Sequence, residues 1–164
     1  MSSRTSSAPP LGFPDVVAGI ERRQPTEAER QFFFKRRDVP GYAASDNRFV
    51  LNPYSALSAK ELRAVALNEA ARIHIRTNPD LKPNFDLTKE QRDNLSGADY
   101  KNAPPADRLA TIAARLLSGD PTGGDPTAAQ IKFIEKLRGA MGLGPSRGLL
   151  TYPRPRVPGG LLSP

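Results

Sequence analysis

The feature that most constrains the fold of this 164-residue chain is a short motif that recurs along it. A Ser or Thr is followed three residues later by Glu or Gln, and then by apolar residues at helical spacing. In a capping box the hydroxyl oxygen accepts from the third backbone N–H, and the acidic or amide side chain accepts from the capping N–H. Each motif therefore predicts the first turn of a helix. The pairs are Thr26 with Glu29, Ser58 with Glu61, Thr88 with Gln91, and Thr127 with Gln130.

A different pattern lies between the first two predicted helices. Residues 41–52 place apolar and β-favouring residues on both sides of the run Ser45-Asp46-Asn47, which favours a tight turn, and Pro53 follows. This pattern predicts a β-hairpin, which must lie against the helices because an isolated hairpin is only marginally stable in water. We therefore predict a mainly α fold: a small helical domain with one short β-hairpin and extended Pro-rich terminal arms.

Apolar spacing within the helical segments predicts which side chains are buried. We expect a short helix at 15–23, and two of the three residues Phe32, Phe33 and Phe34 inside the core. Glu69 and Arg72 are three residues apart and are expected to pair on the exposed side of their helix. The last helix is expected to bury Ile131, Ile134 and Leu137. The predicted core as a whole contains Leu62, Val65, Ile73, Ile112, Leu116, Ile134 and Leu137.

The two ends of the chain are rich in Ser, Pro, Gly and Arg and cannot bury a core of their own. We predict a flexible or docking N-terminal arm at 1–14, a helical core domain at 15–144, and a Pro/Arg-rich C-terminal arm at 145–164. The run "YPRPRVP" favours polyproline II, which leaves its backbone open to a neighbour. The C-terminal arm is therefore expected to dock on another subunit or stay solvated, with docking favoured. The predicted contact residues are Leu149, Leu150, Tyr152, Arg154, Arg156, Leu161 and Leu162.

The net charge of +7, from 24 Lys and Arg against 17 Asp and Glu, favours a polyanionic partner or a solvated basic surface. There is no cysteine, so a disulfide or a Cys-ligated metal is excluded. No segment has the pattern of a signal peptide or of a membrane span, and we expect a protein that is neither secreted nor transmembrane. The residues that could contact nucleic-acid phosphates non-specifically are Arg22, Arg23, Arg30, Lys35, Arg36 and Arg37.

The segment "LSAKELRAVALNEAARIHI", Leu57 to Ile75, resembles the active-site helix of zinc metallopeptidases. Glu69 stands at the position of the general base, but Asn68 and Arg72 replace the two histidine ligands, and a guanidinium has no lone pair for zinc. The only histidine, His74, has no second histidine to pair with. A capped core helix accounts for the same residues. We therefore predict no metal, no other cofactor and no catalytic residue; an inactive relic of a metallopeptidase is the remote alternative.

Two longer blocks, "GYAASDNRFVLNPYSALSAKELRAVALNEAARIHIRT" and "AARLLSGDPTGGDPTAAQIKFIEKLR", resemble short proteins of tailed bacteriophages. This resemblance implies a minor virion component of the head, connector or tail, assembled in the host cytoplasm. The leading hypothesis is a non-enzymatic structural or assembly protein that docks on other virion proteins or on copies of itself, without a membrane or small-molecule substrate. A basic DNA-binding accessory protein is the second hypothesis.

Overall fold

The computed structural model describes residues 13–94, 104–118 and 125–144. Within these ranges the protein is mainly helical, which confirms the predicted fold class. The helices are α1 (Glu27–Lys35), α2 (Ala59–Thr77), the 3-10 helix η2 (Pro79–Leu81), α3 (Lys89–Asn94), α5 (Pro105–Ser118) and α6 (Ala128–Ala140). The strands are β1 (Val16–Val17), β2 (Ile20–Glu21), β3 (Gly41–Ala43) and β4 (Phe49–Leu51).

All four predicted capping boxes are formed. At α2, the Ser58 hydroxyl accepts from the Glu61 N–H at 3.1 Å, and the Glu61 carboxylate accepts from the Ser58 N–H at 3.0 Å. The boxes at α1, α3 and α6 have the same reciprocal bonds. Each cap satisfies N–H groups that a helix leaves without an internal acceptor, which is why the motif located the helix starts correctly.

The predicted hairpin is β3–β4, an antiparallel pair in which Tyr42 lies opposite Val50. Its turn contains the expected polar run, and Asn47 adopts the left-handed conformation with φ of 63°. Gly41 is required for close packing, because a Cβ at this position would lie 2.7 Å from the carbonyl oxygen of Val50. The hairpin packs directly against α2, as a two-stranded sheet of this size requires.

The prediction of a short helix at 15–23 is wrong, because this segment forms the small hairpin β1–β2. Val17 pairs with Ile20 across a two-residue turn formed by Ala18 and Gly19, whose φ angles are 51° and 82°. Two consecutive positive φ angles match the twist of a tight hairpin, and glycine adopts one of them without steric cost. β-Branched residues on both sides of the turn strengthen the preference for strands.

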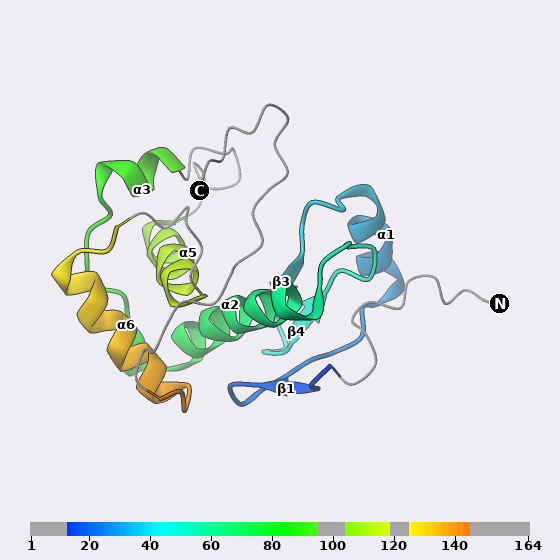
Figure 1. The fold of residues 1–164 in the computed structure, drawn as a ribbon, viewed down its shortest axis with the longest axis horizontal. Coiled ribbons are helices and arrows are strands. Elements are labelled where there is room, and N and C mark those ends of the chain that lie inside the picture. The colour runs from blue at the N-terminus through cyan, green and yellow to red at the C-terminus, as the bar shows by residue number, and fades with distance from the viewer. Residues whose placement is uncertain (1–12, 95–103, 119–124, 145–164) are drawn as a thin grey trace.

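Helix α2 runs through the middle of the molecule, with α5 and α6 on one side and the strands on the other (Figure 1). One core cluster joins the C-terminal half of α2 to α5, α6 and η2, and a second joins α2 to β4. A third, smaller cluster of Phe33, Ala44 and Val50 holds α1 against the β3–β4 hairpin. Leu62, Val65, Ile73, Ile112 and Leu137 are fully or almost fully buried, and Leu116 and Ile134 are partly buried, at the edge of the core.

Three expectations about side-chain burial are wrong. Only Phe33 of the three consecutive phenylalanines is buried, and in α6 the core residue is Phe133 instead of Ile131, which is 49% exposed. Glu69 pairs with Arg72 at 3.6 Å as expected, but its side chain is buried between α2 and its neighbours. Helix periodicity defines the relative positions of side chains, whereas the contacts made by neighbouring elements decide which face is covered.

The α3 and α6 caps meet through a buried pair of amides. Gln91 donates to the Oε1 atom of Gln130 at 2.8 Å, and Gln130 donates to the Oε1 atom of Gln91 at 2.8 Å. Gln130 also donates to the Asp86 carbonyl oxygen at 2.9 Å. Two residues that close separate capping boxes therefore also join their helices.

Among the helices of the described ranges, none combines the length and apolar character needed to cross a membrane.

Candidate partner interface

Helix α1 presents an unusual surface, because two large aromatic side chains on it face solvent. Phe33 is fully buried, whereas Phe32 is 48% exposed and Phe34 is 55% exposed. Successive residues of a helix point about 100° apart, so three consecutive phenylalanines cannot share one buried face. The β3–β4 hairpin covers the face that contains Phe33. The face that contains Phe34 has no such cover within the described part of the chain.

The exposed ring of Phe34 belongs to a small aromatic and cationic cluster. It packs edge to face against Tyr54 with ring centroids 5.4 Å apart. The Arg37 guanidinium lies 4.6 Å from the Phe34 centroid and 5.6 Å from the Tyr54 centroid. A guanidinium over an aromatic face is attracted by the electron-rich ring, and the three side chains hold one another in place. Aromatic residues and Arg are enriched in protein–protein interfaces.

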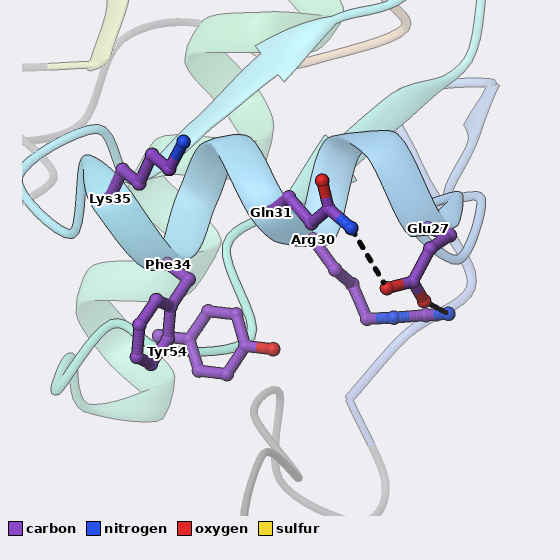
Figure 2. Close-up of a pocket in the computed structure, with 6 residues that line it drawn as sticks. All are labelled: Glu27, Arg30, Gln31, Phe34, Lys35 and Tyr54. Atoms are coloured by element: carbon purple, nitrogen blue, oxygen red, sulfur yellow. Dashed lines mark hydrogen bonds and ion pairs between the residues drawn. The ribbon is translucent and has the colours of Figure 1, made fainter.

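A hollow of about 210 Å³ adjoins this cluster along the outer face of α1. The Phe34 and Tyr54 rings lie at one end and Glu27 with Arg30 at the other, while Gln31 lies between them (Figure 2). Arg30 donates to Glu27 at 2.7 Å, and Gln31 donates to the same carboxylate at 3.4 Å. Lys35 completes the lining. The hollow therefore combines an apolar end with hydrogen-bonding groups.

The inner side of α1 is held by an ion pair that links three segments. Arg23, after β2, donates to the two carboxylate oxygens of Glu29 at 2.8 and 2.9 Å. Tyr42 of β3 donates its hydroxyl to the same carboxylate, and Arg23 reaches Asp46 in the hairpin turn at 3.1 Å. The Arg23 hydrogen bonds lower the pKa of Glu29 to about 2, and burial of Tyr42 raises the pKa of its hydroxyl.

The six basic residues predicted to contact phosphates do not form one open surface. Arg22 and Arg23 have side chains only 12% and 17% exposed, and both are paired with carboxylates. Arg30 and Arg36 form more exposed pairs with Glu27 and Asp38. Arg37 lies on the aromatic rings, and Lys35 has no partner among the described residues. The structure thus brings Arg30, Lys35 and Arg37 close to the aromatic cluster and turns Arg22 and Arg23 inward.

The helix that resembles a zinc-protease helix uses its polar residues in packing. Asn68 donates to the Ser118 hydroxyl of α5 at 3.4 Å and accepts from Arg72 at 3.2 Å. Burial raises the pKa of Glu69, and the charges of Arg72 and Arg115 only partly oppose this rise. The His74 Nε2 atom lies 2.7 Å from the Ala18 carbonyl oxygen. The described residues contain no cluster of three or more His, Cys, Asp or Glu side chains that could hold a metal ion.

The predicted contact residues of the C-terminal arm, 149–162, lie outside the described residues, as do residues 1–12 of the N-terminal arm.

The aromatic cluster was not predicted from the sequence, although the sequence contains a signal for it. Phe34 is seven residues after Glu27 and three after Gln31, so it shares a helical stripe with polar side chains. A large ring on a polar stripe indicates exposure and could have identified the site.

Comparison of the chain with protein-family models, curated proteins and solved structures finds no match.

Proposed function

We propose that this chain is a non-enzymatic minor structural or assembly protein of a tailed bacteriophage virion, in the head, the connector or the tail. The observation that carries the proposal is the contrast between Phe33, which is buried, and Phe34, which is 55% exposed and lies beneath Arg37. Exposing an aromatic ring to water costs free energy, which is regained when a partner covers the ring. The resemblance to phage proteins supplies the context.

The use of polar groups within the fold also supports a role in assembly. Glu69 and Asn68 are buried and bonded to side chains of α2 and α5, and His74 contacts a backbone carbonyl oxygen. In the resembled protease helices, the residue at the position of Glu69 acts as the general base, whereas Glu69 of this chain is buried and paired with Arg72. The polar side chains of this segment position α2 against its neighbours.

The proposed partners are other virion proteins or further copies of this chain, and the terminal arms are proposed to add contacts to those of α1. An extended arm gains contact area without a larger core, and several weak contacts act together when subunits are held close. Deleting residues 145–164 is expected to leave the helical core folded and to abolish incorporation into particles. A deletion variant that is incorporated at the normal level would contradict the proposed role of the arm.

The decisive experiment is a mass-spectrometric inventory of purified phage particles, with the copy number of this chain measured against a portal protein and the major capsid protein. A fixed ratio is expected, and its value assigns the chain to connector, tail or shell. An assembly factor that leaves before completion would instead be found in immature particles, which are analysed in parallel. Complete absence from both kinds of particle, with the protein abundant in infected cells, would refute a structural or assembly role.

A second candidate function is non-specific DNA binding. It is favoured by the net charge of +7 and by the exposed Lys35, which lacks a partner among the described residues. Phosphate contacts would make the affinity for duplex DNA fall steeply with salt. A salt titration of DNA binding tests this function, with Lys35→Gln as the variant that should reduce the salt dependence. No affinity at low salt would refute it.

A further inference from the structure

Two cations at the end of α1 differ from the other basic residues near this helix. The other arginines on or next to α1 pair with carboxylates, as Arg30 does with Glu27 at 2.7 Å. The Arg37 Nε atom instead donates to the Phe34 carbonyl oxygen at 3.4 Å. Within the described part of the chain, neither Arg37 nor Lys35 pairs with a carboxylate. Their positive charges are therefore open to a ligand.

These two charges lie beside the aromatic rings that line the hollow on α1. Phe34 and Tyr54 form its aromatic end (Figure 2), and Lys35 is part of the same lining. The Arg37 guanidinium is 4.6 Å from one ring centroid and 5.6 Å from the other. A cavity of about 150 Å³ holds a benzene molecule. The hollow of about 210 Å³ therefore has room for one large apolar side chain.

We propose that the outer face of α1 binds a short acidic segment of a partner protein, in which one large apolar side chain lies next to carboxylates. The apolar side chain fills the hollow against Phe34 and Tyr54, and the carboxylates accept hydrogen bonds from Arg37 and Lys35. A guanidinium suits this role because its planar N–H groups match the two oxygens of a carboxylate. The inference rests on the proposed function, since it names the chemistry of the partner that covers α1 in the assembly.

The aromatic end of the hollow is held in place by a buried amide. Asn52 is fully buried, and its Oδ1 atom accepts from the Tyr54 N–H at 2.7 Å. Its Nδ2 atom donates to the carbonyl oxygens of Arg36 and Val39 at 3.3 and 2.8 Å. One side chain thus fixes the Tyr54 loop to the residues that end α1. A site that is ordered before binding loses less conformational entropy on binding, which favours a short ligand.

The charge of this face selects an acidic segment. Its cations are Arg30, Lys35 and Arg37. Of the residues that line the hollow, only Glu27 is acidic, and it already accepts from Arg30 and Gln31. Lys35 is about 12 Å from Glu27 along the helix axis, which exceeds the Debye length of about 8 Å at physiological ionic strength. Carboxylates at Lys35 and Arg37 are therefore attracted there and repelled little by Glu27, whereas a basic segment would meet like charge.

The geometry of the rings favours a peptide over a single-stranded nucleic acid. Such strands bind by stacking successive bases on aromatic faces. Here the Phe34 and Tyr54 rings meet at 80°, and the Arg37 guanidinium lies over Phe34. A nucleic acid also has a charge on every nucleotide, so a phosphate beside Glu27 would be repelled. A peptide can place its carboxylates at the basic end alone.

A contact of this size is expected to be weak. One face of a nine-residue helix offers less than the roughly 800 Å² that each partner buries in a standard interface. A dissociation constant on the order of 100 µM is expected for an isolated segment. In an assembly, further contacts between the same two proteins would raise the occupancy.

A panel of labelled hexapeptides tests the proposal on the purified full-length protein. Each peptide contains one Phe, Leu or Trp among glutamates, in different orders, and fluorescence polarisation measures binding. The best peptide is expected to bind with a dissociation constant on the order of 100 µM. Lys35→Glu and Arg37→Glu are each expected to weaken it by about tenfold, because an attractive contact becomes a repulsive one. Tyr54→Ala should weaken it by removing one wall of the hollow.

Lys132→Glu makes the same charge change on the exposed side of α6 and is the matched control, which should bind normally. Circular dichroism checks that each variant keeps its helical content, and Lys35→Glu, at an exposed position, is the variant that decides if another loses it. Two further peptides replace the glutamates with glutamines or the apolar residue with serine, and both are expected to lose binding.

Three results would overturn the inference: no peptide with a dissociation constant below about 1 mM, equal binding by the glutamine or serine peptide, or equal binding to Lys35→Glu. Single-stranded oligothymidylate that displaces the best peptide more effectively than the unlabelled peptide does would assign the face to nucleic acid and would also overturn it. Because the test uses no particles, a protein that binds no peptide but is found in particles at a fixed ratio would overturn this inference alone and leave the proposed function standing.

Discussion

Replacing Glu29 with Gln removes the charge at the centre of the link between β2, α1 and β3 while keeping the shape of the side chain. The capping box at Thr26 should survive, because glutamine closes the equivalent boxes at α3 and α6. The new amide nitrogen, however, takes the place of a carboxylate oxygen that accepts from Arg23. The N–H groups of the new amide then face the N–H groups of Arg23, and two donors cannot bond to each other. The Asp46 carboxylate is then the one carboxylate that still accepts from Arg23 among the described residues.

The size of the effect follows from the pKa of Glu29. Its folded pKa is about 2 against an ordinary value of 4.5, and both partners of the ion pair are largely shielded, with side chains 17% and 18% exposed. Each pKa unit corresponds to about 1.4 kcal/mol, so the charge contributes at most about 3 kcal/mol to the free energy of unfolding at neutral pH. We expect Glu29→Gln to lower that free energy by about 2 to 3 kcal/mol.

The lowered pKa of Glu29 also predicts how its contribution to the free energy of unfolding changes with pH. The folded pKa lies below the unfolded value, so the contribution is complete above the ordinary pKa and is lost as the pH falls toward 2. At about pH 3 less than half of it, roughly 1.4 kcal/mol, should remain. Urea unfolding of wild type and Glu29→Gln at about pH 7 and about pH 3 measures both differences. Equal differences at the two pH values, or less than about 0.5 kcal/mol at neutral pH, would refute the electrostatic reasoning.

Five further substitutions, which make three predictions, test other parts of the fold. Phe33→Ala should cost about 3 to 5 kcal/mol in urea unfolding because the ring is fully buried, whereas Phe34→Ala should cost only about 1 kcal/mol, for its half-exposed contacts with Tyr54 and Arg37. Gln91→Ala and Gln130→Ala should each cost about 2 kcal/mol, because each opens a capping box and breaks the buried amide pair, with a coupling of about 1 kcal/mol in a double-mutant cycle; purely additive losses would contradict a direct bond. Burial raises the pKa of Glu69, so the folded state binds its proton more tightly and stability should fall as pH rises above the ordinary carboxyl range; thermal melts should show that Glu69→Gln reduces this fall.

The candidate interface could be read from the sequence only in part. The sequence identifies basic residues on α1 and at its end, namely Arg30, Lys35 and Arg37. It groups them, however, with Arg22 and Arg23 in one set of residues predicted to contact phosphates. The carboxylates that hold Arg22 and Arg23 are 7 and 6 residues away in the chain, and Asp46 is 23 residues from Arg23. No local pattern states which of several carboxylates a long, flexible guanidinium will meet. The aromatic partner Tyr54 is likewise 20 residues from Phe34 and belongs to the loop after β4.

Local sequence specifies where the helices begin and which segment forms the larger hairpin, because caps and turns are made by residues within a few positions of one another. Which helical faces are covered depends instead on tertiary packing. Phe33 became core because the β3–β4 hairpin lies over it, while Phe34 and Ile131 were left exposed. It also joined Gln91 to Gln130 and buried Glu69 between helices. Burial depends on elements that are distant in the chain, and local periodicity contains no information about where those elements pack.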